Sequence, residues 1–435
     1  MKDHYRHVAC AAFPAYRFVA CIGLLLFAGA VQSAETVGTA LSLREAIEAT
    51  LHANPQLGVY RFREQALMGM RSSASLQPPL QVNGTVEDAL GTGRVKRFES
   101  SEFTLSLSRV IELGGQRDAR VVVVGERREL LRTEQRITEL DLLAEVTRRF
   151  IATAAAQEGL ALQQRASALA LQIVEALQPL VTAGQTPMSE QLRATAALTR
   201  TRLAEARAQT ELEAAKISLA SMWSSQSPGF ARVTANLLDT GEQGDLNALL
   251  QDLEASPDML LFASEQRLQD ARVREVLSER QGTLQWTAGI RHLRESDDAA
   301  LMFGVSRPLG SRTRAAGALA TAQADQQEVA SRRAVALNQM RAQLFALYLP
   351  LQQAVIEVAT LRDEVLPQLD SAREQTRAAY LGGSSAYLNL STAQAEYLDA
   401  EQALVEAATT AHLLRVEIER LSGTALNPDA QESRP

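Results

Sequence analysis

The stretch TLQWTAGIRHL, residues 283–293, alternates apolar and polar side chains in a chain that otherwise has the composition of helices. Leu284, Trp286, Ala288 and Ile290 occupy every second position. Because successive side chains of a strand point to opposite faces, this pattern predicts a strand with one apolar face. The surrounding sequence is rich in Ala, Leu, Gln, Glu and Arg, which favour helices. The first question is therefore what such a strand does in a helical protein.

Three further stretches alternate in the same way, and the four form two pairs. QVNGTVED (81–88) and EFTLSLSRVI (102–111) are the first pair, and LMFGVSRPL (301–309) is the partner of 283–293. Their lengths are close to the 9 to 11 residues that a tilted membrane-spanning strand needs. The polar links inside each pair are typical of hairpin loops. The residues predicted to face lipid are Phe103, Leu105, Leu107, Leu284, Trp286, Ile290, Leu301, Phe303 and Val305.

The chain is internally duplicated. LREAIEATLHANPQL (43–57) matches LNALLQDLEASPDML (246–260), and two later landmarks recur in the same order at an offset of roughly 200 residues. Each half has a short helix, an Asn-Pro or Ser-Pro boundary, a medium helix, a pair of strands, a very long helix, a glycine turn and a last helix. Each half is therefore predicted to be a helical hairpin with strands at its far end.

The longest predicted helix runs from Gln116 to about Val181, which corresponds to a rod on the order of 100 Å. Its counterpart runs from about Arg312 to Leu381, where Pro350 and Pro367 are expected to kink or interrupt it.

Glycine turns are predicted to connect each long helix to the next one. Gly184 ends the first long helix, with Thr186 as the N-cap of the next helix and Pro187 at its first position. Gly382, Gly383 and Ser385 are expected to do the same in the second half. A β-branched residue at Gly184 or Gly382 is expected to disturb the turn.

The N-terminus has the pattern of a secretory signal peptide. Basic residues precede the apolar run CIGLLLFAGA, and small residues follow it up to Ala34. Cleavage after Ala30 or after Ala34 fits equally well. Both cysteines, Cys10 and Cys21, lie in this leader, so no disulfide is expected in the mature chain. A lipid on Cys21 is disfavoured, because Pro14 and Arg17 precede it.

The mature chain is acidic and lacks an obvious reaction centre. Removing residues 1–34 leaves 41 basic and 50 acidic residues and a net charge of −9, which disfavours nucleic acid as a partner. The pattern G-x-S-x-G and the phosphate-loop pattern are absent, so no enzyme, catalytic residue or cofactor is predicted. His52, His292 and His412 are isolated in sequence, so no metal site is predicted.

Four strands are too few for a closed membrane barrel, because such barrels begin at about eight strands. An open sheet edge in lipid would leave backbone groups without hydrogen bonds. Several copies of the chain are therefore expected to pool their strands in one barrel, with the helices extending away from it. A soluble α+β domain with two hairpins, or a periplasmic coiled-coil structural or adaptor protein without a membrane barrel, is the alternative.

These landmarks together resemble the TolC-like outer-membrane efflux proteins, or outer membrane factors, from Leu41 to about Leu426. The resemblance rests on LSLREAIEATLHANPQL, VIELGGQRDAR, AGQTPMSEQLRATAAL and YLGGSSAYLNLSTAQAEYLDAEQAL. The phrase IELGGQR is most similar to the branch that serves heavy-metal exporters. The resemblance implies a mainly α protein with a small β part, in which the long hairpins form an α-barrel and three copies share a twelve-stranded β-barrel.

The resemblance also implies a function and partners. The homotrimer would lie in the outer-membrane lipid of a Gram-negative bacterium, with a large periplasmic part. It would passively conduct substrate, with heavy-metal cations as a candidate, from a periplasmic adaptor (membrane fusion) protein and an inner-membrane pump of the resistance-nodulation-division type. The tip and docking residues would be Gly184, Thr186, Pro187, Leu381, Gly382, Gly383 and Ser385.

One departure concerns the periplasmic aperture. Family members often carry a ring of acidic residues after the second tip, whereas this chain has Asn389 and Thr392 in that stretch. Glu190, which follows the first tip, or Glu396 further along could supply the missing carboxylate, and the aperture candidates are Glu190, Asn389 and Thr392. The positions after the second tip therefore lack the acidic ring that the resemblance implies.

The predicted organisation follows the duplication. It comprises a signal peptide (1–34), an N-terminal segment with the first medium helix (35–75), the first β-hairpin (76–111), the first long helical hairpin (112–225), a linking region with the second medium helix (226–281), the second β-hairpin (282–309), the second long helical hairpin (310–422) and a C-terminal tail (423–435).

Overall fold

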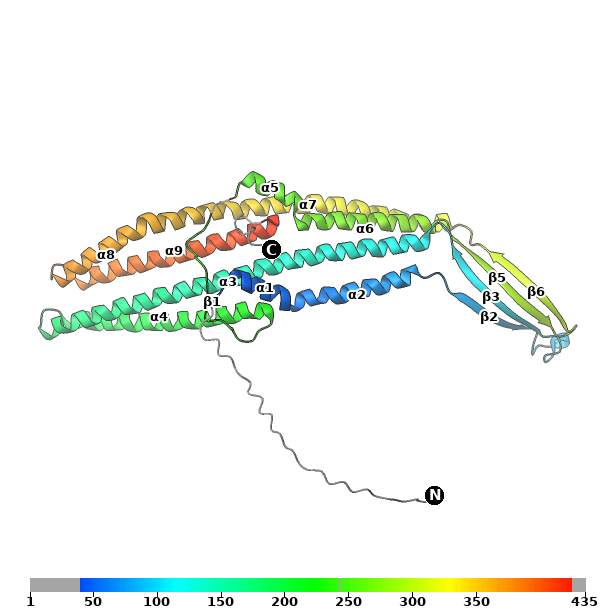
Figure 1. The fold of residues 1–435 in the computed structure, drawn as a ribbon, viewed down its shortest axis with the longest axis horizontal. Helices are drawn as coiled ribbons and strands as arrows, with labels where there is room; N and C mark the ends of the chain where they lie inside the picture. Colours follow the sequence, from blue (N-terminus) through cyan, green and yellow to red (C-terminus); the bar gives the residue numbers. More distant parts are fainter. Residues whose placement is uncertain (1–39, 242–243, 425–435) are drawn as a thin grey trace, which may run out of the picture. The chain divides into compact units, whose positions relative to one another are not determined.

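A computed structural model describes residues 40–241 and 244–424 of the chain. The predicted signal peptide at 1–34 lies outside the described residues, as does most of the predicted C-terminal tail. The described part consists mainly of long helices, together with one four-stranded sheet (Figure 1). The predicted fold class, mainly α with a small β part and a duplicated plan, is therefore confirmed.

The two halves of the chain repeat the same order of elements. The helices of the described first half are α1 (Leu43–Ala53), α2 (Pro55–Ser75), α3 (Gln116–Thr182) and α4 (Met188–Ala220), with short 3₁₀ turns η1 (Gly93–Val95) and η2 (Ser221–Trp223). Those of the second half are α5 (Leu246–Ala255), α6 (Pro257–Glu279), α7 (Ser311–Thr360), a π-helical turn η3 (Leu361–Val365), α8 (Leu366–Leu381) and α9 (Tyr387–Ser422).

Local capping explains where the short and medium helices begin. The hydroxyl of Ser42 accepts a hydrogen bond from the amide of Glu45, and the Glu45 carboxylate accepts one from the amide of Ser42, which starts α1. Asn54 caps α2 and Ser256 caps α6, and a proline follows each of them as the first helical residue. The Asn-Pro and Ser-Pro pairs therefore act as helix boundaries.

The second long helix contains a π-helical turn, whereas α3 is α-helical throughout. The chain passes from α7 through η3 into α8, and Pro367 lies in the first turn of α8. Proline has no N–H to donate, so a wider turn just before it is a common accommodation. Pro350 lies inside α7 with no break in the helix, whereas a π-helical turn precedes Pro367.

The sheet joins the two halves of the chain. Its strands are β2 (Leu80–Glu87), β3 (Glu102–Glu112), β5 (Thr283–Leu293) and β6 (Asp298–Ser306), in the spatial order β2-β3-β5-β6 with every neighbour antiparallel. The central pair, β3 and β5, therefore comes from different hairpins. A separate two-residue pairing links β1 (Ala40–Leu41) in parallel with β4 (Arg232–Val233).

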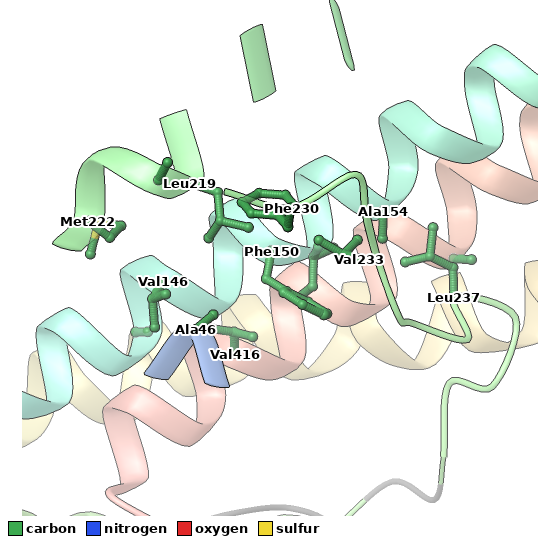
Figure 2. Close-up of a cluster of buried hydrophobic side chains, with 14 of the residues drawn as sticks. Ala46, Val146, Phe150, Ala154, Leu219, Met222, Phe230, Val233, Leu237 and Val416 are labelled. Atoms are coloured by element: carbon green, nitrogen blue, oxygen red, sulfur yellow. The ribbon is translucent and has the colours of Figure 1, made fainter. Parts of the chain in front are cut away.

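The largest buried cluster is built on α3 and draws on both halves (Figure 2). Val146 and Phe150 of α3 pack in one cluster with Leu219 of α4 and Val416 of α9. The segment after α4 adds Phe230, Val233 and Leu237. Burying an apolar side chain of this size contributes about 1.5–3 kcal/mol, so this cluster is a main attachment between the two long hairpins.

One helical segment is unusually apolar for a part exposed to water. Within Ser311–Leu381, an 18-residue window has a mean hydropathy of 1.4, and 28% of that window is buried. By length and composition alone this segment is long and apolar enough to cross a membrane. The sequence has no run of about 18 uninterrupted apolar residues there. Its exposed apolar side chains include Val335, Phe345, Leu349 and Ile356.

Candidate functional site

The strand register places all nine residues predicted to face lipid on one face of the sheet. Directly paired residues share a face, and Leu107, Ala288 and Phe303 form one such row across β3, β5 and β6. Leu105, Ile290 and Leu301 form the next row. The side chains of Leu301 and Phe303 are 74% and 80% exposed, so this apolar face is uncovered in a single copy.

Polar groups occur on the apolar face only near its two ends. Towards the helices, the Nε of Arg109 donates to the carbonyl of Pro78 at 3.2 Å, and Trp286 lies in the same row. Towards the hairpin loops, the Nε2 of His292 lies 3.7 Å from a carboxylate oxygen of Asp297. An apolar band with an aromatic and polar ends is the pattern of a surface that crosses a bilayer.

The opposite face of the sheet is polar. Gln81, Asn83 and Thr85 of β2 lie beside Thr104, Ser106 and Ser108 of β3 on this face. The side-chain amide of Asn83 donates to the hydroxyl of Ser108 at 3.2 Å. Gly289 of β5 also lies on this face, where a Cβ would come within 2.8 Å of the Leu105 carbonyl oxygen, so glycine permits the close approach of β3 and β5.

The sheet is open at both sides. In the described part of the chain, β2 and β6 each pair along one edge only. The free edges carry backbone N–H and C=O groups that need a partner wherever water is absent.

The first hairpin tip closes through the backbone. The amides of Gly184 and Gln185 donate to carbonyls one turn back in α3 at 3.0 and 2.9 Å, which is a Schellman motif, and Gly184 has φ +72°. The predicted cap was wrong. α4 begins at Met188 with Pro187 as its N-cap, and no side chain caps it, because the extended backbone of Pro187 (ψ 144°) puts Thr186 outside the helix.

The second tip has the same motif, with the second of its two adjacent glycines in the left-handed position. Gly383, not Gly382, has the left-handed backbone, with φ +74° against −79° for Gly382. The amides of Gly383 and Ser384 donate back into α8 at 3.0 and 2.9 Å. α9 begins at Tyr387 with Ala386 as its N-cap, so Ser385 is not a cap either; its hydroxyl instead accepts from the side chain of Asn389 at 3.2 Å.

The two tips pack against each other. Leu177 and Ala194 of the first hairpin form one buried cluster with Tyr380, Tyr387 and Leu390 of the second. The rings of Tyr380 and Tyr387 meet edge to face with centroids 6.4 Å apart. The hairpins are therefore held together near their ends as well as at the cluster in Figure 2.

The aperture candidates lie around this cluster. Burial raises the pKa of the Tyr380 phenol, and the negative charge of Glu190 raises it further, so the two side chains are electrostatically coupled. Glu190 is half-buried in the first turn of α4, whereas Asn389 and Thr392 are exposed on α9. The two aperture candidates on α9, Asn389 and Thr392, are therefore both uncharged.

The histidines are distributed over separate parts of the molecule. His52 is exposed on α1, His292 lies on the sheet, and the Nε2 of His412 lies 3.0 Å from the Leu237 carbonyl oxygen, where burial lowers the pKa of the ring. Among the residues that the structure describes, no group of three or more His, Cys, Asp or Glu is arranged to hold a metal ion.

Sequence reasoning missed two groups of polar residues. Tyr380 and Tyr387 join the tips, and Arg291 donates to Glu102 at the loop end of the sheet. The alternation already placed Glu102 and Arg291 off the apolar face. Their meeting depends on the pairing of β3 with β5, which no local pattern indicates.

Comparison with known proteins agrees with this architecture. Residues 46–225 match the model of the family described as outer membrane efflux protein. The chain is 25% identical over 372 residues to the cobalt-zinc-cadmium resistance protein CzcC of Cupriavidus metallidurans. This alignment covers 84% of each protein.

Three solved structures have the same fold at low sequence identity. CusC superposes with a TM-score of 0.74 at 15% identity, over 90% of this chain and 96% of that one. VceC from Vibrio cholerae gives 0.68 at 17% identity, over 88% and 97% of the two chains. The MtrE channel of Neisseria gonorrhoeae gives 0.69 at 19% identity, over 88% and 89%. The resemblance seen in the sequence is thereby confirmed.

Proposed function

We propose that this chain, whose residues 46–225 match the outer membrane efflux protein family, forms the outer-membrane channel of a tripartite efflux system in a Gram-negative bacterium. The observation that carries this proposal is the two-faced sheet. One face is a band of exposed apolar side chains, the other is polar, and both edges are unpaired in one copy.

A sheet of this kind is suited to a barrel shared between copies. In lipid the edges of β2 and β6 must be paired, and the simplest partner for each is the other edge in a neighbouring copy. Three copies would give twelve strands, and the likeness to CusC, whose structures concern transmembrane channel formation, supports a shared channel. The apolar face then turns to lipid and the polar face to a water-filled lumen.

The helices support the same assembly. Val335, Phe345, Leu349 and Ile356 of α7 are large, apolar and exposed in a single copy. Such side chains are normally covered by a partner when they are this numerous on one helix. We assign this surface to packing between copies in an α-barrel that continues the lumen through the periplasm.

The hairpin tips are the proposed docking site for a periplasmic adaptor protein, which connects the channel to an inner-membrane pump of the resistance-nodulation-division type. The docking set is Gly184, Thr186, Pro187, Leu381, Gly382, Gly383 and Ser385. Met188, Leu192, Leu381 and Leu388 are exposed apolar side chains at or just after these turns, which suits a surface that packs against a protein partner.

The proposed cargo is heavy-metal cations, which the channel conducts passively while the pump supplies the energy. The likeness to CzcC supports this choice, and the net charge of −9 expected for the mature chain is compatible with it. We place the periplasmic aperture at Glu190, Asn389 and Thr392.

Membrane fractionation tests the channel against a periplasmic coiled-coil protein without a barrel. The channel requires a heat-modifiable trimer that is extracted from the outer membrane with detergent. Release of the whole protein by osmotic shock, as a water-soluble monomer, would contradict the proposal. Sensitivity of a deletion strain to a panel of metals, dyes and antibiotics then identifies the cargo.

A pair of substitutions tests which face meets lipid. Arginine in place of Phe303, near the middle of the apolar face, should destabilise insertion by about 2–4 kcal/mol per copy. Arginine in place of Thr287, on the polar face of the neighbouring strand, should insert normally because its side chain reaches the lumen. The measurement is the fraction of heat-modifiable trimer, and equal loss for F303R and T287R would refute the assignment of the faces.

A further inference from the structure

The loop end of the sheet's polar face carries a row of carboxylates. The register aligns Glu87 of β2 with Glu102 of β3, Glu102 with Leu293 of β5, and Leu293 with Asp298 of β6. This set of Glu87, Glu102 and Asp298 is called the outer carboxylate row. It lies at the strand ends that adjoin the hairpin loops, away from the joins with the helices.

Arg291 of β5 binds this row from one position further in. Its Nη1 donates to Glu102 at 2.9 Å, its Nε donates to the hydroxyl of Thr104 at 3.2 Å, and its Nη2 lies 3.5 Å from a carboxylate oxygen of Glu87. Carboxylates directly opposite each other on neighbouring strands repel. The guanidinium between them offsets that repulsion and connects three strands.

The row keeps a negative charge after this pairing. Three carboxylates against one guanidinium leave a net charge of −2 per copy, or −6 for three copies. The adjoining loops, 88–101 and 294–297, carry four basic and four acidic residues and do not offset it.

The remaining polar face has little charge of its own. Towards the helices it continues through Asn83, Ser106, Gln81 and Ser108, which are uncharged. The next acidic residue on the strands is Glu112, which pairs with Arg120 of α3 where the sheet meets the helices. The outer row is therefore the main unbalanced charge along this wall.

We propose that the outer carboxylate row is a charge-selecting ring at the exit of the channel, which favours small hydrated cations over anions, and that Arg291 sets its strength. This inference rests on the proposed function, because it requires three copies with their polar faces turned to the lumen. The ring is not a binding site; it sets the potential through which the cargo leaves. It also supplies a location for charge selection in a chain whose α9 aperture positions, Asn389 and Thr392, are uncharged.

The test is the reversal potential of the full mature protein in planar bilayers under a KCl gradient. Near 0.01 M salt, where screening extends over about 30 Å, the wild type should prefer K⁺ to Cl⁻. R291Q should increase this preference, and E102Q and D298N should reduce it. Each substitution should change the K⁺/Cl⁻ permeability ratio by about twofold or more. A unit charge about 10 Å away in water contributes roughly 0.4 kcal/mol, which corresponds to that ratio. Near 1 M salt the differences should vanish.

Two controls separate local charge from other effects. The double variant R291Q/E102Q keeps the net charge of the row and should return the wild-type reversal potential, even though the bridge is lost. R109Q removes a positive charge from the apolar face at the other end of β3, so it should leave the reversal potential unchanged. D298N changes an exposed side chain at the start of β6, which gives a variant expected to fold normally.

The outcomes distinguish the two proposals. A protein that forms no trimer and inserts no channel would refute the proposed function. Channels that insert but show the same reversal potential in wild type, R291Q, E102Q and D298N would overturn the ring and leave the channel assignment standing. A shift in R109Q as large as that in R291Q would also overturn it, since selection would then follow total charge.

Discussion

Alanine at Gly383 should open the second hairpin tip, whereas alanine at its neighbour Gly382 should not. Gly383 has φ +74° and Gly382 has φ −79°, although the two are adjacent in one turn. An L-residue in the left-handed region costs about 1–2 kcal/mol. A Cβ at Gly383 would meet nothing within 4 Å, so this conformational term is the whole local cost.

The expected cost at Gly382 has the opposite sign. A Cβ there would lie 3.4 Å from the Ala378 carbonyl oxygen, close to ordinary contact, and the backbone is one that alanine adopts. Replacing glycine at a compatible position stabilises a protein by about 0.4–1 kcal/mol, because the unfolded chain loses freedom. The two variants should therefore differ by roughly 1.5–3 kcal/mol in the stability of the tip.

Hydrogen exchange measures this difference directly. The amides of residue 383 and of Ser384 donate back into α8, and they exchange only when the turn opens. Since about 1.4 kcal/mol corresponds to a tenfold change, G383A should speed their exchange by roughly 5- to 30-fold, and G382A should leave it equal or slower. G184A at the first tip should behave like G383A, because Gly184 has φ +72°.

The result that would refute this reasoning is equal exchange in G382A and G383A, or faster exchange in G382A. Docking provides a second readout. Valine at Gly184 or Gly383 should weaken complementation of a deletion strain while the trimer content stays normal. Valine at Gly382 should weaken complementation less than valine at Gly383, because Gly383 rather than Gly382 has the left-handed backbone. The sequence alone predicts Gly184 and Gly382 as the positions where a β-branched residue disturbs the turn.

Two further predictions concern the helices. L177A should lower the free energy of unfolding by about 2–5 kcal/mol, because Leu177 is fully buried between the two tips; a melting temperature equal to that of wild type would contradict this. E275Q should make stability less dependent on pH. Burial raises the pKa of Glu275 above its ordinary value of 4.5, and nearby Glu279 raises it further, so the wild type loses stability as pH rises from 4.5 through the raised value. Denaturant midpoints that fall equally with pH in both proteins would refute the role of Glu275.

The strands could be predicted from the sequence because a half-apolar strand leaves a period of two that little else produces. The stretch 283–293 coincides with β5, and the other three strands lie within three residues of their predicted ends. Their faces followed from the same period. The caps failed because Thr186 and Pro187 are both acceptable at a helix start, and the backbone of the tip decides between them. Likewise, two adjacent glycines carry no local mark of which one becomes left-handed.

Contacts between distant segments could not be predicted in this way. Arg291 reaches Glu102 and Glu87 only because β3 pairs with β5, and these strands are separated by the whole of α3 and α4. The packing of Tyr380 and Tyr387 against Leu177 likewise joins two hairpins from different halves. Periodicity reports which face a side chain occupies. It carries no information about which residue of another element lies opposite.

An assembly of several copies is nevertheless a proposal that one chain supports, because closure of the sheet is a requirement of the solvent rather than of a particular contact. A four-stranded sheet leaves two edges, and in water each edge can bind solvent. In hydrocarbon each unpaired backbone group costs several kcal/mol. Strands that are long enough to cross a bilayer, but too few to close a barrel, therefore imply that other copies supply the missing strands. The stability of one protomer's sheet is then inseparable from assembly, as for obligate oligomers. It follows that substitutions at the outer edges of β2 and β6 should act on trimer formation before they act on the helices, whose cores close within a single copy.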